Sequence, residues 1–400
     1  MANVSSSNGL EKRPKLRFPG FDEPYRTTLL GEIASLVNRT DPKSNAPIMM
    51  LSAGNGFIMQ SEKYSRDNAG QSLKKYILLK QGELAYNHGA SKVKQFGCCY
   101  ELTEPEARIP YVYHCFKINE DEYTPYVAMA LNNAKMDQQL KRLVSSSVRM
   151  DGLLNISFED YMSVTLHLPS FIEQKHIADF LTKLDERIAY QERLITSLKK
   201  YKRGVLMYYF SDDNTRQWTH YSVSQIGKVI TGSTPPTNDR SNYDGDLLFC
   251  SPGDVGEKKY ISSTEKRVSP KGFALGRPLP PNAVIVTCIG LIGKLGIATT
   301  DMITNQQINA LVVSEGFDHE FIYYAFENFF PEYRSKVSMQ TLPILSKSEF
   351  EKLKIKVPVL DVQLKISSHL AAMDRRIEHT QQELNALLEQ RRGFMQQLFI

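Results

Sequence analysis

Cysteine and histidine are scarce in this sequence and show no crosslinking or metal-binding pattern. The five cysteines among 400 residues form no Cys-x-x-Cys pair, and their odd number does not suit a full set of disulfides. The eight histidines show neither His-x-x-x-His nor His-Glu-x-x-His spacing. These absences argue against a disulfide framework, a zinc ribbon and a zinc-protease site, and we expect a reduced protein that binds no metal.

Long hydrophobic runs are also missing. The longest, residues 283–293, is about half the length of a membrane span and is interrupted by Thr287 and Gly290. The opening segment, Met1 to Pro14, is polar and rich in serine, and no apolar segment follows it, which is not the pattern of a signal peptide. We therefore expect a cytoplasmic protein without a membrane segment.

The charge balance is only mildly basic. A formal net charge of +5 permits a polyanionic partner, but many proteins that never bind nucleic acid have a similar excess. The length of 400 residues exceeds the usual size of one hydrophobic core. Two or more globular domains are therefore expected.

What the sequence does contain is an internal repeat. Residues 169–210 align with residues 358–399 without a gap, and a weaker match aligns residues 25–33 with residues 218–226. Between these matches the copies share little, so each half consists of a variable domain and a constant segment. Identical pairs in the constant segments include Pro169 and Pro358, Gln174 and Gln363, Asp185 and Asp374, Gly204 and Gly393, and Phe210 and Phe399.

Each constant segment has the heptad spacing of a long amphipathic helix, and its polar exceptions, Gln191 and Lys202, align with Thr380 and Arg391. A helix over residues 172–210 would be roughly 58 Å long, too long for an ordinary core helix. We predict that the two helices pair as an antiparallel coiled coil about a pseudo-two-fold axis, although packing on their own domains or homodimerisation would also bury the stripe. The predicted seam residues are Ile177, Leu181, Leu184, Ile188, Ile195, Leu198, Ile366, Leu370, Met373, Ile377, Leu384 and Leu387.

The variable domains are predicted to be mixed α/β, which gives the chain an α+β fold. Short runs of β-forming residues alternate with glycine and proline, while residues 125–143 and 319–336 suit helices. Strand order does not follow from the sequence. The strand candidates are residues 76–79, 111–118, 247–250, 284–287 and 310–313. The predicted organisation is a tail and lead-in over 1–21, variable domains over 22–165 and 212–354, and helices over 166–211 and 355–400.

Loops between the predicted strands contain residue types that read DNA. Arginine and lysine donate to guanine or phosphate, and asparagine and glutamine pair with the adenine edge in the major groove. Any single one of them is more often an ordinary solvated loop residue, so the prediction applies to the set. The candidates are Lys92, Lys94 and Gln95 in the first domain and Thr231, Ser233, Lys294, Asn305, Gln306 and Gln307 in the second.

This arrangement resembles the specificity subunits of Type I restriction-modification systems over nearly the whole chain. The local marks are the lead-in at residues 14–21, the Leu-Gly-Glu-Ile start at residues 30–33, the two constant segments, and Asn-Gln-Gln at residues 305–307 before a strand. Two positions depart from the family pattern: Tyr25 stands where tryptophan is frequent, and Val362 stands where the first copy has Glu173.

The resemblance implies a non-catalytic subunit in which each variable domain is a target recognition domain for one half of an asymmetric, bipartite site on double-stranded DNA. The helices would set the gap between the half-sites. Two methyltransferase subunits would dock on the chain, and two ATP-driven restriction subunits would join them. S-adenosylmethionine, ATP and magnesium would then be bound by those partners, and this chain would hold no cofactor.

Enzymatic alternatives have weak support in the sequence. Residues 234–237, Thr-Pro-Pro-Thr, lack the amide and aromatic groups of an adenine-methyltransferase turn, and Asp254 lies too close to Glu257 and Lys259 for a magnesium-dependent nuclease. Residues 290–294 lack the full phosphate-binding loop. The competing class is a tandem-domain adaptor with a helical spacer, whose binding should be far less sensitive to salt than DNA binding.

Overall fold

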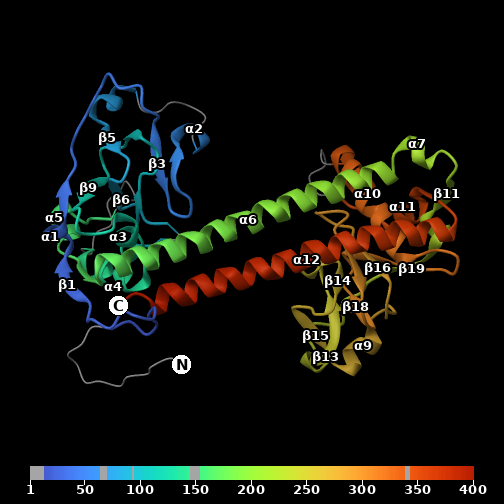
Figure 1. Ribbon diagram of the computed structural model, residues 1–400. Coiled ribbons are helices and arrows are strands. Elements are labelled where there is room, and N and C mark those ends of the chain that lie inside the picture. The colour runs from blue at the N-terminus through green and yellow to red at the C-terminus, as the bar shows by residue number, and fades with distance from the viewer. Residues whose placement is uncertain (1–12, 64–69, 92–93, 145–153, 338–342) are drawn as a thin grey trace. The chain divides into compact units, whose positions relative to one another are not determined.

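The computed structural model describes residues 13–63, 70–91, 94–144, 154–337 and 343–400 (Figure 1). Contacts divide the chain into two compact units: unit 1 comprises residues 1–190 and 383–400, and unit 2 comprises residues 191–382. The division passes through both long helices, α6 (Phe171–Tyr209) and α12 (Leu360–Gln397), so each unit contains a part of either helix. The domain boundaries given above separate helices from domains and stay predictions.

Unit 1 is built around an antiparallel sheet with strand order β2-β9-β6-β7, and three two-stranded pairs, β1-β10, β3-β4 and β5-β8, surround it. Its strands are β1 Arg26–Leu29, β2 Ala34–Leu36, β3 Met49–Ser52, β4 Gly56–Met59, β5 Ile77–Lys80, β6 Leu84–Asn87, β7 Cys98–Glu101, β8 Glu106–Ile109, β9 His114–Ile118 and β10 Thr165–Leu168. Its shorter helices are α1 Leu30–Ile33, α2 Gln60–Lys63, the 3-10 helix η1 Gly70–Lys75, α3 Thr124–Ala130, α4 Ala134–Leu143 and α5 Phe158–Met162.

Unit 2 is built around a sheet with order β12-β19-β16-β17-β14, accompanied by β15-β13-β18 and the pair β11-β20. Its strands are β11 Thr219–Ser222, β12 Gly227–Thr231, β13 Tyr243–Cys250, β14 Tyr260–Ile261, β15 Lys266–Val268, β16 Val284–Thr287, β17 Leu295–Ala298, β18 Met302–Thr304, β19 Ile308–Val313 and β20 Lys354–Val357. Its shorter helices are α7 Asp212–Thr215, α8 Val223–Ile226, η2 Arg240–Asn242, η3 Pro252–Asp254, α9 Pro270–Leu275, α10 His319–Val337 and α11 Lys347–Lys352.

The repeat seen in the sequence reappears in the strand order of the two units. The order β2-β9-β6-β7 corresponds to β12-β19-β16-β17, with antiparallel pairing throughout both sets. The pair β1-β10 likewise corresponds to β11-β20. The weaker of the two sequence matches covers β1-α1 and β11-α8, and the stronger covers each long helix and the short segment that precedes it.

Gln174 and Gln363, which the repeat aligns, make the same two contacts in the two units. The Gln174 side chain donates to the Pro169 carbonyl (3.0 Å) and accepts from the Tyr123 main-chain N–H (2.9 Å). Gln363 repeats both contacts, with the Pro358 carbonyl (2.9 Å) and the Asp318 N–H (2.9 Å). Each glutamine therefore ties the start of a long helix to the loop before the helix that follows the sheet, and its burial makes the loss of either bond costly.

One predicted helix is divided in the structure. Residues 125–143 form α3 and α4 rather than one helix, whereas α10 is continuous over 319–337. Asn133 causes the break, because its side chain caps α4 by accepting from the N–H groups of Lys135 and Met136 (both 2.9 Å). Asn132 occupies the turn and binds the main chain of Cys99 in β7.

The two long helices run antiparallel within each unit. In unit 1 the Phe180 and Phe394 rings lie 4.9 Å apart and Asp185 pairs with Arg391, so numbers rise along α6 as they fall along α12. In unit 2, Lys202 pairs with Asp374 and Tyr209 Oη lies 2.7 Å from His369 Nδ1, which gives the same direction. The antiparallel pairing predicted from the heptads is present in both units.

The seam residues predicted from the heptads lie in two places along the long helices. Members near the helix starts lie in domain cores: Ile177 and Leu181 in unit 1, and Ile366 and Leu370 in unit 2. The middle of the seam contains buried Ile188, Ile195, Leu384 and Leu387, and partly buried Leu184, Leu198, Met373 and Ile377.

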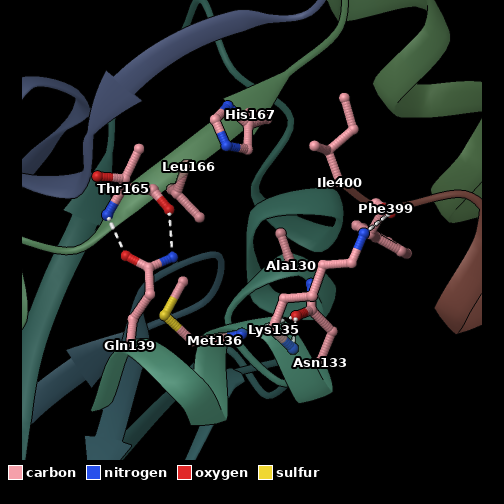
Figure 2. Close-up of a pocket in the computed structure, with 10 residues that line it drawn as sticks. All are labelled: Ala130, Asn133, Lys135, Met136, Gln139, Thr165, Leu166, His167, Phe399 and Ile400. Carbon is pink, nitrogen blue, oxygen red and sulfur yellow. Dashed lines mark hydrogen bonds between the residues drawn. The ribbon is translucent and has the colours of Figure 1, made fainter. Parts of the chain in front are cut away.

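The end of each long helix is held by an aromatic residue that the repeat aligns. Phe210 packs edge-on to Trp218 (5.7 Å) in unit 2, while Phe399 stacks on Tyr126 (5.1 Å) in unit 1. Figure 2 shows Phe399 beside α4, where Lys135 Nζ donates to its carbonyl oxygen (3.0 Å). The pocket drawn there is therefore a helix-anchoring junction, and none of the predicted DNA-contact residues lines it.

Candidate nucleic-acid interface

The predicted contact residues of unit 2 gather at one end of its sheet, where β12 and β16 finish and β19 begins. Ser233 N–H donates to the Thr304 carbonyl (2.8 Å), and Thr231 Oγ1 donates to Asn309 Oδ1 (2.7 Å). Gly232 permits this close approach, because a Cβ there would lie 2.2 Å from the Asn305 carbonyl oxygen. The structure thus brings the 231–233 and 305–307 segments side by side.

Among the predicted residues of this cluster, only Gln306 is exposed. Asn305 Nδ2 donates to Gln307 Oε1 (3.2 Å) and Gln307 N–H donates to Asn305 Oδ1 (3.1 Å), so these two amides shape the loop. Gln306 Oε1 accepts from Thr234 Oγ1 (2.6 Å), and this contact fixes the amide while its N–H₂ group stays available as a donor. Gln306 is the best placed residue of the set for a contact with a base edge.

Lys294 lies in the β16-β17 hairpin at the same end of the sheet. Its main-chain N–H donates to Thr287 Oγ1 (3.0 Å), and the hairpin is tied to the neighbouring loop by the bond from Cys288 N–H to the Gln307 carbonyl (2.8 Å). Gly290 and Gly293 have positive φ angles of 73° and 77°, which a tight turn requires. All six candidates in unit 2 are therefore placed at one end of the sheet.

Arg277 is a member of this cluster that the sequence did not indicate. Its Nη1 donates to the Thr231 carbonyl (2.9 Å), and its side chain is exposed. Among the described cations nearby, Lys271 is paired with Asp239 (2.7 Å) and lowers the pKa of that carboxyl to about 2, whereas Arg277 contacts no carboxylate in the described part of the chain. No local pattern singles out Arg277, because only the fold brings it to Thr231.

The candidates of unit 1 occupy the β6-β7 loop, the counterpart of the β16-β17 hairpin. Gln95 is exposed, while Lys94 is half-buried and its Nζ donates to the Asn132 carbonyl (2.7 Å). Lys92 lies outside the described residues. Burial raises the pKa of Asp137, and the Lys94 charge partly offsets this rise, so the lysine also contributes to the local electrostatics of the domain.

The residues that resemble catalytic motifs are hydrogen-bonded or ion-paired within the fold. Asp254 accepts from Ser251 N–H (2.8 Å) and Glu265 N–H (2.7 Å), and Lys259 binds Glu320 and the Tyr324 hydroxyl (2.8 Å). Neither side chain is therefore free to form a magnesium site with the other. The carbonyls of Pro235 and Pro236 accept from Tyr243 Oη (2.6 Å) and Asn242 Nδ2 (3.0 Å), as expected of an anchored turn.

The cysteines are free and buried, and burial raises the pKa of Cys98 and Cys288 to about 11. Both thiols therefore stay protonated near neutral pH. No group of three or more potential metal ligands was found among the residues that the structure describes. None of the described helices combines the length and the hydrophobicity needed to cross a membrane.

A family comparison bears directly on the second half of the chain. Residues 215–390 match the model of the Type I restriction modification DNA specificity domain. The matched range contains the unit 2 sheet, the clustered loops and most of α12, and it confirms the resemblance recognised from the repeat.

Two curated relatives of the specificity family match parts of the chain. The specificity subunit of the Type I restriction enzyme MjaIX from Methanocaldococcus jannaschii is 29% identical over 180 residues, which cover 44% of this chain and 41% of that protein. The specificity subunit of the Type I restriction enzyme HindI from Haemophilus influenzae is 27% identical over 110 residues, 27% of this chain and 24% of that protein. These matches span less than half the length of either relative.

Solved structures extend the likeness in fold to nearly the whole chain. The S subunit of a Type I restriction-modification system from M. genitalium aligns with a TM-score of 0.63 at 14% identity, covering 97% of this chain and 99% of that one. A chain from a study of complex assembly and conformational transition of the type I R-M system aligns with a TM-score of 0.57 at 16% identity, covering 95% and 98%. The predicted fold class, two mixed domains with two long helices, is confirmed.

Proposed function

We propose that this chain is the DNA sequence-recognition subunit of a Type I restriction-modification complex. The observation that carries the proposal is the repeat of one sheet order and one helix junction in two units whose loops differ, together with the specificity-domain match over residues 215–390. Each recognition domain reads one half of a bipartite target in double-stranded DNA. Because the loops differ between the copies, the two half-sites differ as well and the target is asymmetric.

Residues of the cluster at the end of the unit 2 sheet suit different kinds of DNA contact. The N–H₂ donor of Gln306 suits an acceptor on a base edge, and the exposed guanidinium of Arg277 suits a phosphate. Asn305 and Gln307 hold the loop in shape. In the first domain, Gln95 and Lys94 lie in the β6-β7 loop, the counterpart of the β16-β17 hairpin that contains Lys294.

The chemistry of the complex is assigned to partner subunits. Two methyltransferase subunits dock on the recognition domains and helices, and two ATP-dependent restriction subunits join them in the cytoplasm. S-adenosylmethionine, ATP and magnesium are bound by these partners, and this chain is non-catalytic and selects the DNA site. Two observations support this assignment. Asp254 and Lys259 are hydrogen-bonded to other residues of the fold, and the buried cysteine thiols are protonated.

The salt dependence of DNA binding tests the proposal against the adaptor alternative. We expect the affinity of the full chain for duplex DNA to fall steeply as salt rises, because bound counterions are released at each contacted phosphate. The measurement is a titration of labelled duplex at several salt concentrations. Arg277→Ala should reduce the slope of log affinity against log salt by about one, whereas Lys365→Ala, an exposed cation on α12, should not. A flat response of the unsubstituted chain would favour the adaptor.

A further inference from the structure

Two ion pairs between the long helices are related by the repeat. In unit 1, Arg391 of α12 forms a bidentate ion pair with the Asp185 carboxylate of α6, with Nη2 3.0 Å from Oδ2. In unit 2, Lys202 of α6 lies 2.7 Å from Asp374 Oδ1 of α12. The repeat aligns Asp185 with Asp374 and Lys202 with Arg391, so each pair is the image of the other with the helices exchanged.

The spacing of these charges matches on both helices. The separation between Asp185 and Lys202 on α6 equals the separation between Asp374 and Arg391 on α12. Both pairs can therefore form together in one antiparallel alignment. The apolar heptads are less selective, because a displacement by one heptad, roughly 10.5 Å, brings apolar positions back into line but separates both charge pairs.

The basic members occupy seam positions, where an unpaired charge is unfavourable. The Lys202 side chain is 12% exposed and that of Arg391 is 36% exposed. Each falls in the heptad pattern at a position that apolar residues occupy elsewhere along the helix. A polar residue at such a position specifies register, since a misaligned helix leaves the charge on the seam without its partner.

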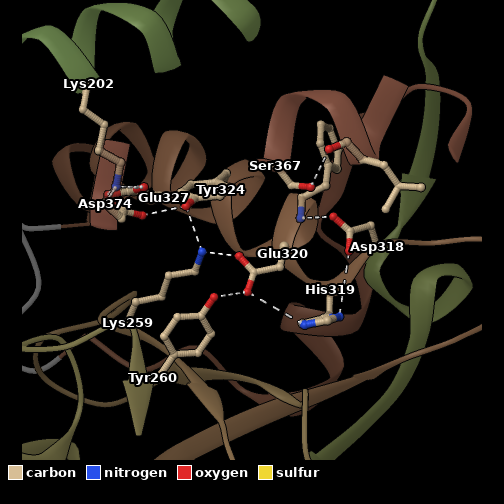
Figure 3. Close-up of polar contacts among 12 residues, drawn as sticks. Lys202, Lys259, Tyr260, Asp318, His319, Glu320, Tyr324, Glu327, Ser367 and Asp374 are labelled. Atoms are coloured by element: carbon tan, nitrogen blue, oxygen red, sulfur yellow. Dashed lines mark hydrogen bonds and ion pairs between the residues drawn. The ribbon is translucent and has the colours of Figure 1, made fainter. Parts of the chain in front are cut away.

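In unit 2 the ion pair is also fastened to the recognition domain. Figure 3 shows Lys202 between Asp374 and Glu327, with both Glu327 oxygens 3.0 Å from Nζ. Tyr324 Oη donates to Asp374 (2.6 Å) and accepts from Lys259 (2.8 Å). Because Glu327 and Tyr324 lie on α10, the helix alignment is rigidly linked to the helix that covers the unit 2 sheet.

We propose that Asp185–Arg391 and Lys202–Asp374 are positioning contacts that hold the helices in one register and make the gap between the DNA half-sites strict. The inference rests on the proposed function, because it gives the ion pairs a role in target selection. None of the four side chains needs to touch DNA for this role. Loosened pairing would let the helices slip by one heptad, about 10.5 Å, so that the recognition domains engage half-sites about three base pairs nearer or farther.

The test uses the unit 1 pair, because it can be reversed without disturbing a larger network. Asp185→Arg and Arg391→Asp each place like charges together, and the double variant restores an ion pair with opposite polarity. Each full-length variant is produced in cells with the cognate methyltransferase subunit, and methylated adenines are mapped. Glu186→Arg, an exposed neighbour of Asp185 on the same helix, is the matched control.

We expect each single reversal to raise methylation at least tenfold at sites whose gap differs by about three base pairs, with unchanged half-site bases. The double variant should restore the strict gap. Asp185→Asn, which preserves side-chain size, should give the same change if a reversal variant fails to fold. A strict gap in Asp185→Asn and in every soluble reversal variant would overturn the proposal and assign the register to the anchored helix ends. A wild-type chain that directs no bipartite methylation would instead count against the proposed function.

Discussion

At the scale of single residues, His114 joins two segments of unit 1. Its Nε2 lies 2.9 Å from the Ile156 carbonyl, and its ring stacks on His88 at 4.9 Å. Burial lowers the pKa of His114 below its ordinary value, and the neighbouring His88 adds to this effect. The neutral imidazole is therefore the form that the folded domain prefers.

This preference predicts a loss of stability in mild acid. The unfolded chain takes up the His114 proton first, near pH 6.5, so the free energy of unfolding should fall as the pH drops below that value, by at most about 1.4 kcal/mol per pH unit. Urea unfolding at several pH values measures the slope. His114→Gln, which retains a donor for Ile156, should flatten the profile, while exposed His220→Gln should leave it unchanged. Identical slopes in all three chains would contradict this account.

Residue-level prediction from the sequence was uneven for a physical reason. Gln174 and Gln363 stood out because the repeat aligns them, and the structure shows the same two contacts around each. Arg277 did not stand out, because its partner, the Thr231 carbonyl, is distant in the chain and only the fold brings the two near. Lys259 drew attention only as part of a nuclease-like motif, and its pairing with Glu320 likewise depends on the fold. The DNA-contact assignments stay predictions.

At the scale of secondary-structure elements, heptads and repeats were the most informative signals. The helix expected over residues 172–210 is present as Phe171–Tyr209, because an apolar stripe of that length can be buried only along another long helix. Strand order could not be predicted, because β-forming runs state which residues are extended and not which strands pair. The division into α3 and α4 escaped prediction because it depends on how Asn132 and Asn133 bond their own and neighbouring main chain.

The elements that link the domains give a prediction about length. Deleting residues 188–194 from α6 together with residues 377–383 from α12 removes one heptad from each helix and leaves both interhelical ion pairs in place. Each helix becomes about 10.5 Å shorter, which corresponds to about three base pairs. We expect the mapped methylation motif to keep its half-site bases while its gap shortens. Changed half-site bases with an unchanged gap would contradict the spacer role.

At the scale of the whole molecule, the repeat accounts for the proposed form of the target. One fold used twice gives two half-sites, and different loops on the two copies give two different sequences. The β6-β7 loop of unit 1 lies between Asn87 and Cys98, whereas the β16-β17 hairpin of unit 2 lies between Thr287 and Leu295. Such a difference at equivalent positions of the sheets is the basis for expecting an asymmetric motif.

The central claim is that this chain determines which DNA sites are methylated, and a genome-wide map of methylated adenine tests it most directly. Cells that produce the chain with its cognate methyltransferase subunit are compared with cells that produce the methyltransferase alone. The account predicts a new asymmetric, bipartite motif that appears only when the chain is present. If no new motif appears while the same methyltransferase is active in complex with another specificity subunit, the chain does not select the sites of methylation.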